Sequence, residues 1–436
     1  MTFVQRWRAT LAGVDWARLN HVLIRSSRSR RIPEPSWDRG EGTSGRIFRL
    51  FQSLTPAGRS LFVGTLVTAA FAIDVSQTHV YLLLAVLGGA LVASIFVSRF
   101  LGSQVTQAVV HGPPRVFVGA EATFTIQCTR VESPRPLPLR VEGPFLPYFG
   151  RWLRRPGILE TDDRATSTTA SFAAKFQERG DLTLGRFRVS NLVPLGLASG
   201  PPIETMPFRI RIVPRPANVV RIDLPMAAKH QPGGVALASK TGESMDLRGV
   251  RPYRKGDRIR DLSARTWART GKPAVREYQE EYFTRVGVVL DCAGAAGSER
   301  ARERAFEAAI SLTAGIVGRL ARGDALVDLL VTGGEVHALT VGRSLGFLEQ
   351  ALDHLAVAEL HPNVDRTVVL ERLEPFLPRL SAVVMVTDGW DAAREALRRG
   401  LEQRGVRVHC VVVGEGGSSV RSIAIETIES GAGIRV

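Results

Sequence analysis

Two long apolar runs near the start of the chain are the strongest feature in its pattern of hydrophobic and polar positions. They cover residues 57–73 and 80–97, and the second run contains no charged residue. As helices rising about 1.5 Å per residue they are each about 25–27 Å long, enough to cross the hydrocarbon core of a membrane. A pair of buried core helices is the alternative, but the second run lacks a polar face. We therefore predict a two-helix transmembrane hairpin over residues 57–98.

The charges around the hairpin predict its orientation. Residues 1–59 carry eleven arginines and four acids, whereas residues 74–79, between the two runs, carry neither Lys nor Arg. Basic segments next to membrane helices stay on the cytoplasmic side. We expect residues 1–56 to form a basic cytoplasmic region near membrane lipid, and the chain to return to the cytoplasm after the hairpin.

Residues 104–215 alternate between apolar and polar positions with a period of two. Phe124 and Ile126 alternate with threonine and glutamine, and Ile210 and Ile212 alternate with arginine. A period of two is that of a strand with one buried face. Clusters of proline and glycine separate these stretches, as turns would. The pattern predicts a small antiparallel domain resembling a β-sandwich.

From residue 284 to the end, strand-like and helix-like patterns alternate. Four mostly apolar runs have the length of strands buried on both faces, at 286–290, 325–331, 382–386 and 406–413. Three longer stretches between them have helical patterns, at 299–320, 345–357 and 392–403. This alternation predicts an α/β, Rossmann-like domain over residues 284–436, with a parallel sheet covered on both faces. The chain as a whole is thus expected to be multi-domain.

Two acidic residues follow strands of this predicted sheet. Asp291 comes directly after the first apolar run, and Asp388 comes just after the third. Ligands of open α/β sheets bind beyond the carboxyl ends of the strands. We therefore take Asp291 and Asp388 as candidate partner-binding residues.

These two acids, on this order of strands and helices, resemble the metal-ion-dependent adhesion site of von Willebrand factor A-type domains. That site uses Asp-x-Ser-x-Ser, a loop threonine and a second aspartate, which offer the oxygen ligands that a divalent cation requires. Here the motif positions are Asp291, Ala293 and Ala295, so two hydroxyl ligands are absent, and the loop at 363–367 matches poorly. The resemblance implies a von Willebrand factor A-like fold with a degenerate site, in which Asp291 and Asp388 are remnants that cap helices or orient the rim. No metal or cofactor is expected, and a divalent cation is the alternative.

The segment 216–283, between the two predicted domains, carries three short motifs. They read Gly242-Glu-Ser-Met-Asp-Leu-Arg248, Tyr253-Arg-Lys-Gly256-Asp257 and Arg260-Asp261-Leu-Ser-Ala-Arg265. Together they resemble the signature of the domain-of-unknown-function-58 family (DUF58), although Leu262 stands where that family usually has an aromatic residue. The resemblance implies a bacterial inner-membrane protein whose main domains are cytoplasmic. It also implies association with a MoxR-type AAA+ ATPase, in the assembly or maturation of envelope proteins.

The segment 216–283 also contains a strongly basic stretch. The chain carries 57 Lys and Arg against 42 Asp and Glu, a net charge of +15, and the stretch 254–276 holds eight bases and two acids. These charges form either an internal ion-pair network or a docking surface for an acidic partner or for phosphate groups, which arginine binds bidentately. The candidate partner-binding residues here are Arg254, Asp257, Arg260, Asp261 and Arg265.

The absence of nucleic-acid-binding motifs and the spacing of the cysteines restrict the class of protein further. Electrostatic binding of nucleic acid or of a lipid surface is one alternative function, but specific nucleic-acid recognition is not expected, because no stacking-platform motif or groove-reading helix is recognisable. The three cysteines, Cys128, Cys292 and Cys410, are far apart in the sequence. They argue against a disulfide framework and suit a reducing compartment.

One catalytic pattern is present. Gly342-Arg-Ser344-Leu-Gly346 fits Gly-x-Ser-x-Gly, and Asp388 and His409 follow in the order of a serine hydrolase triad. However, no His-Gly-Gly oxyanion loop precedes the serine, and Ser344 suits an ordinary helix N-cap. A nucleotide-binding Gly-Lys-Ser/Thr loop is also absent from the sequence. We therefore expect a non-catalytic adaptor or scaffold, not an enzyme, with a serine hydrolase as the alternative.

Overall fold

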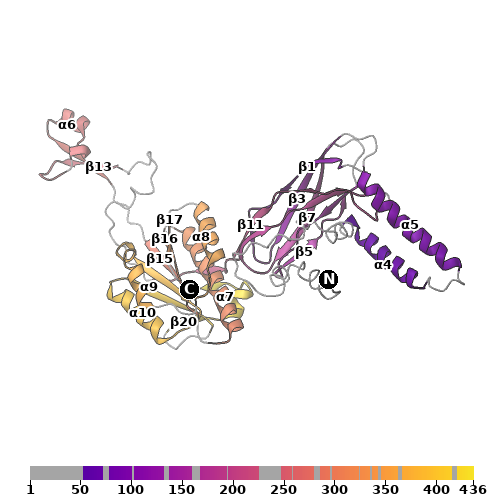
Figure 1. Cartoon of the computed structure of the whole chain (residues 1–436). Coiled ribbons are helices and arrows are strands. Elements are labelled where there is room, and N and C mark those ends of the chain that lie inside the picture. The colour runs from indigo at the N-terminus through magenta and orange to yellow at the C-terminus, as the bar shows by residue number, and fades with distance from the viewer. Residues whose placement is uncertain are drawn as a thin grey trace, which may run out of the picture. The chain divides into compact units, whose positions relative to one another are not determined.

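The computed structural model describes residues 53–71, 78–100, 103–131, 137–159, 167–193, 195–224, 247–257, 259–278, 285–294, 297–323, 325–333, 336–341, 345–361, 366–414 and 420–436. Most of the predicted basic region 1–56 therefore lies outside the described residues. Contacts divide the chain into two compact units, Met1–Pro214 and Arg215–Val436. Unit 1 holds the apolar helices and the β-rich part, and unit 2 holds the signature segment and the α/β part (Figure 1).

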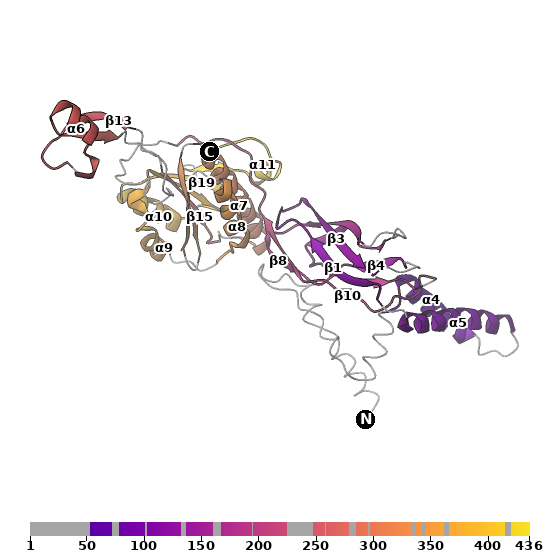
Figure 2. The ribbon, with the colours of Figure 1, turned by 90° about the horizontal axis from the view of Figure 1, so that it is seen from above.

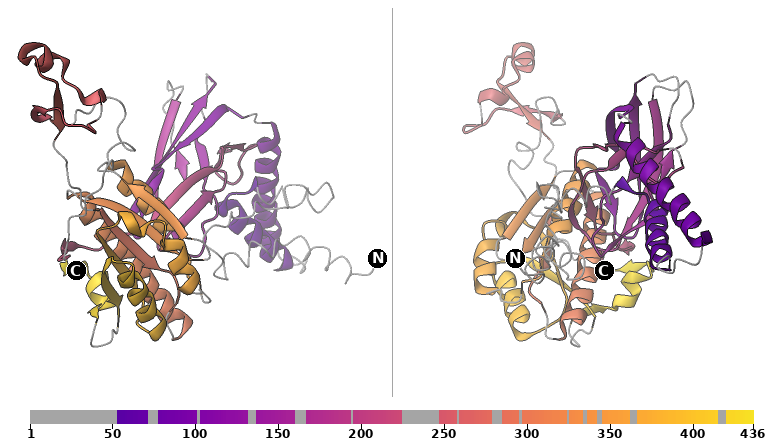
Figure 3. Two further views of the ribbon diagram at one scale, coloured as in Figure 1. Left: turned by 90° about the vertical axis from the view of Figure 1, so that its left-hand side faces the viewer. Right: turned by 45° about the vertical axis from the view of Figure 1, so that its right-hand side comes forward.

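Two apolar helices form in unit 1 at the two predicted runs, α4 (Pro56–Phe71) and α5 (Thr78–Phe100). They lie side by side, and both are drawn in indigo in Figure 3. Apolar side chains are exposed on both helices, among them Leu66, Val86 and Val92. Residues His79–Ser98 of α5 are long and apolar enough to cross a membrane, and no second span of this kind occurs in the described part of the chain.

Three sheets make up the β-rich part of unit 1. The first has the order β1 (Val105–His111), β3 (Glu121–Arg130), β7 (Ser167–Phe176), β5 (Gly150–Arg154). The second has the order β10 (Ile203–Glu204), β9 (Arg188–Asn191), β4 (Leu139–Glu142), β6 (Ile158–Leu159), and the third has β2 (Arg115–Phe117), β11 (Phe208–Val213), β8 (Gly180–Leu184). Neighbouring strands are antiparallel except β2 and β11, which pair in parallel. The prediction of a purely antiparallel domain was wrong at this pair.

The core of this part is built from the alternating positions. Along β3, Phe124, Ile126 and Cys128 are fully buried while the residues between them are not. The ring of Phe124 stacks on Phe172 of β7 at 5.9 Å between centroids, and Phe172 lies 4.9 Å from Phe187. The period of two thus places one face of each strand in a shared aromatic core.

Unit 2 begins with a short strand, β12 (Val219–Arg221), that pairs in parallel with β21 (Ile434–Arg435) at the other end of the unit. The signature motifs follow in an antiparallel hairpin of β13 (Leu247–Pro252) and β14 (Ala274–Tyr278). Between these strands lie a short 3-10 helix, η2 (Ile259–Asp261), and the helix α6 (Ala264–Thr270). We call residues 247–278 the signature lobe.

The remainder of unit 2 is an α/β domain around a six-stranded sheet. The strand order is β17 (Val336–Val341), β16 (Leu326–Thr332), β15 (Arg285–Asp291), β18 (Ala382–Thr387), β19 (Arg407–Val413), β20 (Arg421–Ile423). All neighbours are parallel except β17 and β16. The predicted parallel sheet is therefore a mixed sheet with one antiparallel edge strand.

Helices cover both faces of this sheet (Figures 1 and 2). One face packs against α9 (Arg366–Leu373), η3 (Leu377–Arg379) and α10 (Ala392–Gln403) in one apolar cluster. On the other face α7 (Glu299–Ala321) contacts four of the strands, and α8 (Leu345–Val357) and α11 (Ile425–Glu429) contact α7. The predicted helices at 299–320, 345–357 and 392–403 correspond to α7, α8 and α10.

Candidate functional site

The sheet brings the two acids that follow its strands to one place. β15 and β18 are parallel neighbours, with Leu290 opposite Val386, so that their carboxyl ends lie at the same edge. Asp291 ends β15 and Asp388 directly follows β18. Both residues are buried, with 3% and 5% of their surface exposed. Two buried carboxylates at one edge require a compensating positive charge.

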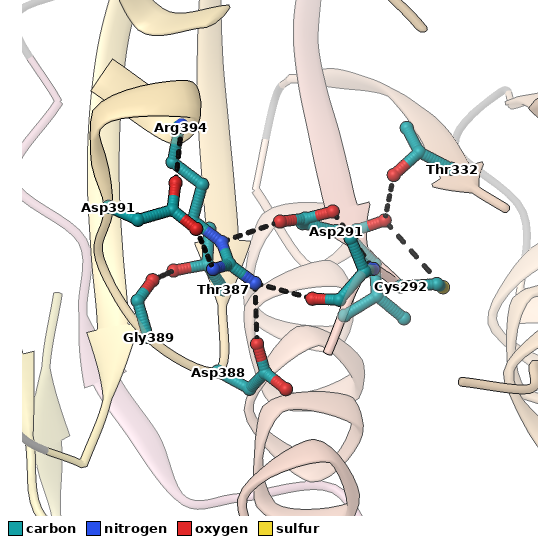
Figure 4. A network of polar contacts seen from close by, with 10 residues as sticks. Asp291, Cys292, Thr332, Thr387, Asp388, Gly389, Asp391 and Arg394 are labelled. Carbon is teal, nitrogen blue, oxygen red and sulfur yellow. Dashed lines mark hydrogen bonds and ion pairs between the residues drawn. The ribbon is translucent and has the colours of Figure 1, made fainter. Parts of the chain in front are cut away.

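The guanidinium of Arg394 supplies that charge (Figure 4). Its Nε donates to Oδ2 of Asp291 at 2.7 Å, and Nη2 donates to Oδ1 of Asp388 at 2.8 Å and to the carbonyl oxygen of Ala293. Nη1 donates to Oδ2 of Asp391 at 2.9 Å. The side chain of Arg394 is 1% exposed. We call this set of residues the Arg394 network.

Local sequence explains how α10 presents this arginine. Asp391 is the N-cap of α10, and its Oδ1 accepts a hydrogen bond from the backbone N–H of Arg394 at 2.7 Å. A basic side chain in the first turn of a helix opposes the helix dipole. Arg394 is held there because three carboxylates and one carbonyl oxygen surround it.

The loop that follows β15 is fixed by the same residues. Oδ1 of Asp291 accepts the N–H of Ala293 at 3.0 Å, which leaves Oδ2 for Arg394. His361 then donates its N–H to the carbonyl oxygen of Cys292 at 2.8 Å. Asp291 therefore binds both the backbone of its own loop and the guanidinium of Arg394.

A divalent cation at this edge would compete with Arg394 for the carboxylates. Ala293 stands at a position where the adhesion motif has a hydroxyl, and the positive charge of Arg394 lies between the carboxylates that such a cation would need. No group of three or more His, Cys, Asp or Glu side chains suited to a metal occurs among the described residues. The loop at 363–367, which was compared with the threonine loop, lies mostly outside them.

Arg394 cannot be identified as a site residue from the sequence alone. It contacts Asp291 across 103 residues of sequence, a separation that no local motif reports. One local signal was available. Arg394 lies three positions after the capping residue Asp391, in the first turn of a helix, where acidic residues are usual. Asp291 and Asp388 were placed at the right edge, but their carboxylates are buried, and a partner at this edge would first meet the residues around them.

In the signature lobe, Asp257 shapes a turn. Its Oδ2 accepts from Nη1 of Arg251 at 2.8 Å and its Oδ1 from Nη2 at 2.9 Å, while the N–H of Arg254 donates to Oδ2 at 2.8 Å. The hydrogen bonds from Arg251, and next the one from the backbone of Arg254, lower the pKa of Asp257 to about 2. Gly256, between these residues, has φ of +107°, which favours glycine. Asp257 is thus ionised at neutral pH and orders the loop that precedes η2.

The bases of the lobe lie on its surface. Exposed basic side chains are found at Arg254, Lys255, Arg265, Arg269, Lys272 and Arg276. Large apolar side chains lie exposed beside them, at Val250, Tyr253, Ile259 and Trp267. Helix α6 buries none of its residues. Asp261 is half-buried, and the side chain of Arg260 lies outside the described part. Both alternatives for these charges, a docking surface and an internal ion-pair network, stay predictions.

Two residues of the hydrolase alternative, Asp388 and His409, lie apart. Ser344 lies outside the described residues. His409 is in the middle of β19, opposite Val384 of β18, so Asp388 is four residues further along that strand. Four strand residues span about 13 Å, which is too far for a hydrogen bond between Asp388 and His409. Burial lowers the pKa of His409, and the carboxylate of Asp388 is bound by Arg394 instead.

Comparison with solved structures shows only weak likeness. Proximal thread matrix protein 1 from the mussel byssus has a TM-score of 0.27 and 14% identity, over 34% of this chain and 44% of that one. Three N-terminal domains of the type V pili tip protein Mfa5 from Porphyromonas gingivalis have a TM-score of 0.21 and 15% identity, over 24% of this chain and 20% of that one. The chain thus spans less than half the length of these structures.

The comparison with families is more specific. No curated protein matches the chain. Residues 249–415 match the model of DUF58, a family described as protein of unknown function. This range begins in the signature lobe and runs through the α/β sheet to the end of β19. The match supports the DUF58 family for the part of the chain that holds both the lobe and the Arg394 network.

Proposed function

We propose that this chain is a membrane-anchored, non-catalytic adaptor whose signature lobe binds an acidic protein partner in the cytoplasm. Its resemblance to DUF58 proteins implies that the partner is a MoxR-type AAA+ ATPase. It also implies that the process is the assembly or maturation of envelope proteins. The observation that carries the proposal is the exposed surface of the lobe, on which bases and large apolar side chains lie together.

The anchor in this proposal is the pair α4 and α5, with both domains on the cytoplasmic side. The apolar span of α5 supports it, as do the apolar side chains that both helices expose. Helix α4 has 16 residues. It is thus about 24 Å long, and local thinning of the bilayer accommodates a span of this length. The excess of arginine before α4 supports the orientation.

The chemistry of the lobe supports a protein partner with an acidic surface. Arginine and aromatic side chains contribute more than other residues to the affinity of protein interfaces. Positive charge on one side favours association with a negatively charged face and excludes positively charged ones. The bidentate pair of Arg251 and Asp257 orders the loop before binding, which lowers the entropic cost of association.

The Arg394 network gives the proposed adaptor a rim whose buried carboxylates are bound by the chain's own cation. Adhesion sites of the degenerate type lack the ligands for a bridging metal, so partner binding is expected to be independent of divalent cations. Asp291, Asp388 and Asp391 act in this proposal by holding the loops at the carboxyl edge of the sheet, next to which a partner binds.

Affinity purification tests the proposal as a whole. The tagged chain is solubilised from its own membranes in detergent, and co-purifying proteins are identified by mass spectrometry with and without chelator. We expect an AAA+ ATPase in both samples. Recovery of no reproducible protein would contradict the adaptor function. Recovery of nucleic acid or lipid alone would also contradict it, and would favour electrostatic binding, whose affinity falls steeply with salt.

Charge reversal tests the lobe. Replacing Arg254, Arg265 and Arg269 together with glutamate is expected to weaken binding of the ATPase at least about tenfold, a loss of about 1.4 kcal/mol. The three side chains are exposed, so the fold of the lobe is expected to persist. Binding is measured by biolayer interferometry with the full chain in nanodiscs, at several salt concentrations.

A triple variant of equal charge serves as the matched control. Arg154, Arg155 and Arg300 are exposed and lie outside the lobe. Their replacement with glutamate changes the net charge by the same amount and is expected to leave the affinity within about twofold. An equal loss of affinity in both variants would show that net charge, and not the lobe, governs the association.

A further inference from the structure

The tip of one β-hairpin in unit 1 has contacts that its own sheet does not explain. Strands β9 and β10 are antiparallel neighbours joined through residues 192–202. Leu192 pairs with Ser199, and the N–H of Val193 donates to the carbonyl oxygen of Ala198 at 3.0 Å, which closes a tight turn. We call the described residues of this turn, 193 and 195–198, the hairpin tip.

The hairpin tip is bound to the start of α4 through backbone groups. The N–H of Thr55 donates to the carbonyl oxygen of Leu197 at 3.0 Å, and its hydroxyl donates to that of Gly196 at 2.6 Å. Leu54 forms an antiparallel bridge with Ala198. A Cβ atom at Gly58 would overlap the carbonyl oxygen of Leu197, so helix and tip touch backbone to backbone.

The same contact reaches the apolar span of α5. Leu54, Leu91, Val193 and Ala198 form one buried cluster, and Leu61 and Ile95 pack against it. Leu91 and Ile95 both belong to the span His79–Ser98. The hairpin tip therefore lies beside the last turns of the apolar span and not beyond its end.

Leu195 projects from this tip into solvent. It is 75% exposed, and its φ of +75° places it in the left-handed region, which no other non-glycine residue among those described adopts. A leucine is strained there. On the neighbouring face of α5, Val92 and Phe96 are likewise exposed. Both the hairpin tip and the second half of α5 therefore expose apolar side chains.

We propose that the hairpin tip lies in the lipid interface, with Leu195 inserted beside the acyl chains, so that unit 1 touches the bilayer at a second point besides its helices. The inference rests on the proposed membrane anchor. The occupant is lipid because Val193 and Ala198 of the tip pack against Leu91 of the apolar span, and because the exposed side chain of the tip, Leu195, is apolar. A second contact point would fix the tilt of the β-rich part against the membrane.

Spin labelling of the full chain tests the inference. Single variants Leu195→Cys, Met206→Cys and Val86→Cys are labelled with a nitroxide and reconstituted in vesicles of equal parts phosphatidylcholine and phosphatidylglycerol. The native cysteines are free but buried, and burial raises the pKa of Cys128 to about 11 and that of Cys410 to about 12. Labelling is therefore expected at the introduced position.

The other two positions are the controls. Met206 is 85% exposed and lies beyond the opposite end of the β9–β10 hairpin, and Val86 is 67% exposed in the middle of the apolar span. Collision rates of each nitroxide are measured with oxygen, which concentrates in lipid, and with a water-soluble nickel complex. We expect the ratio of oxygen to nickel collisions at Leu195 to be several-fold higher than at Met206 and to approach that at Val86.

Each other outcome overturns the inference in a different way. A lipid-like ratio at Val86 with a water-like ratio at Leu195 would leave the anchor intact and refute insertion of the tip. Low collision rates with both reagents at Leu195 would place a protein partner over the tip. A water-like ratio at Val86 would refute the anchor and, with it, the inference.

Discussion

Replacing Arg394 with alanine is expected to destabilise the α/β domain of unit 2 by about 3–5 kcal/mol, because it leaves buried carboxylates without their partner. The side chains of Asp291 and Asp388 are 4% and 0% exposed, so water replaces the guanidinium poorly. The loop after β15 is expected to open first, because the carbonyl oxygen of Ala293 loses its donor as well.

Hydrogen exchange of the full chain, followed by mass spectrometry, measures this effect locally. Peptides covering 285–294 and 386–394 are expected to lose protection in Arg394→Ala. Arg398→Ala is the matched control, because Arg398 lies one turn later on α10 and pairs with Glu395 and Glu402 on the helix surface. Surface pairs contribute about 0–1 kcal/mol, so that variant is expected to keep its protection. Equal protection in Arg394→Ala and the native chain would show that the network does not hold the rim.

Replacing Gly58 with alanine is expected to separate α4 from the hairpin tip, at a cost of about 1–3 kcal/mol or more. The added methyl group overlaps the backbone carbonyl of Leu197, and a backbone atom of a tight turn cannot move aside as a flexible side chain does. Relief requires a shift of the whole helix, which breaks the hydrogen bonds of Thr55.

Gly64→Ala is the control in the same helix. Nothing lies within 4 Å of a Cβ at Gly64, and alanine favours helix over glycine by about 1 kcal/mol. Thermal unfolding of the detergent-solubilised chain and hydrogen exchange of a peptide covering 193–199 distinguish the two variants. We expect loss of protection in Gly58→Ala only. If both variants behaved alike, the contact between helix and tip would be looser than the structure has it.

Much of the architecture was predictable because its signals are local. The period of two marks β3 and β11, and the uniformly apolar runs mark β15, β18 and β19, since each strand is buried in the way its pattern requires. The helices were found for the same reason. Predicted and observed ends of these helices and strands differ by three residues at most, and the caps explain some of these ends, as with Asp391 at the start of α10.

The parts that were missed depend on pairing between distant segments. The direction of β17 against β16 and of β2 against β11 does not follow from the apolar pattern of either strand, because a buried strand has the same pattern in both directions. Arg394 was missed for a related reason. Its own neighbours predict a surface helix, and only the sheet brings it to Asp291.

The pairing of β12 with β21 has a consequence for biosynthesis. These strands close unit 2 at its two ends, and the side chain of Asn218 binds the carbonyl oxygen of Gly431, 213 residues later. The ribosome adds about 5–20 residues per second, so β21 is synthesised about 10–40 s after β12. During that interval unit 1 has all its strands and unit 2 still lacks its closing one. Until then the edge of β12 is open to chaperones and proteases.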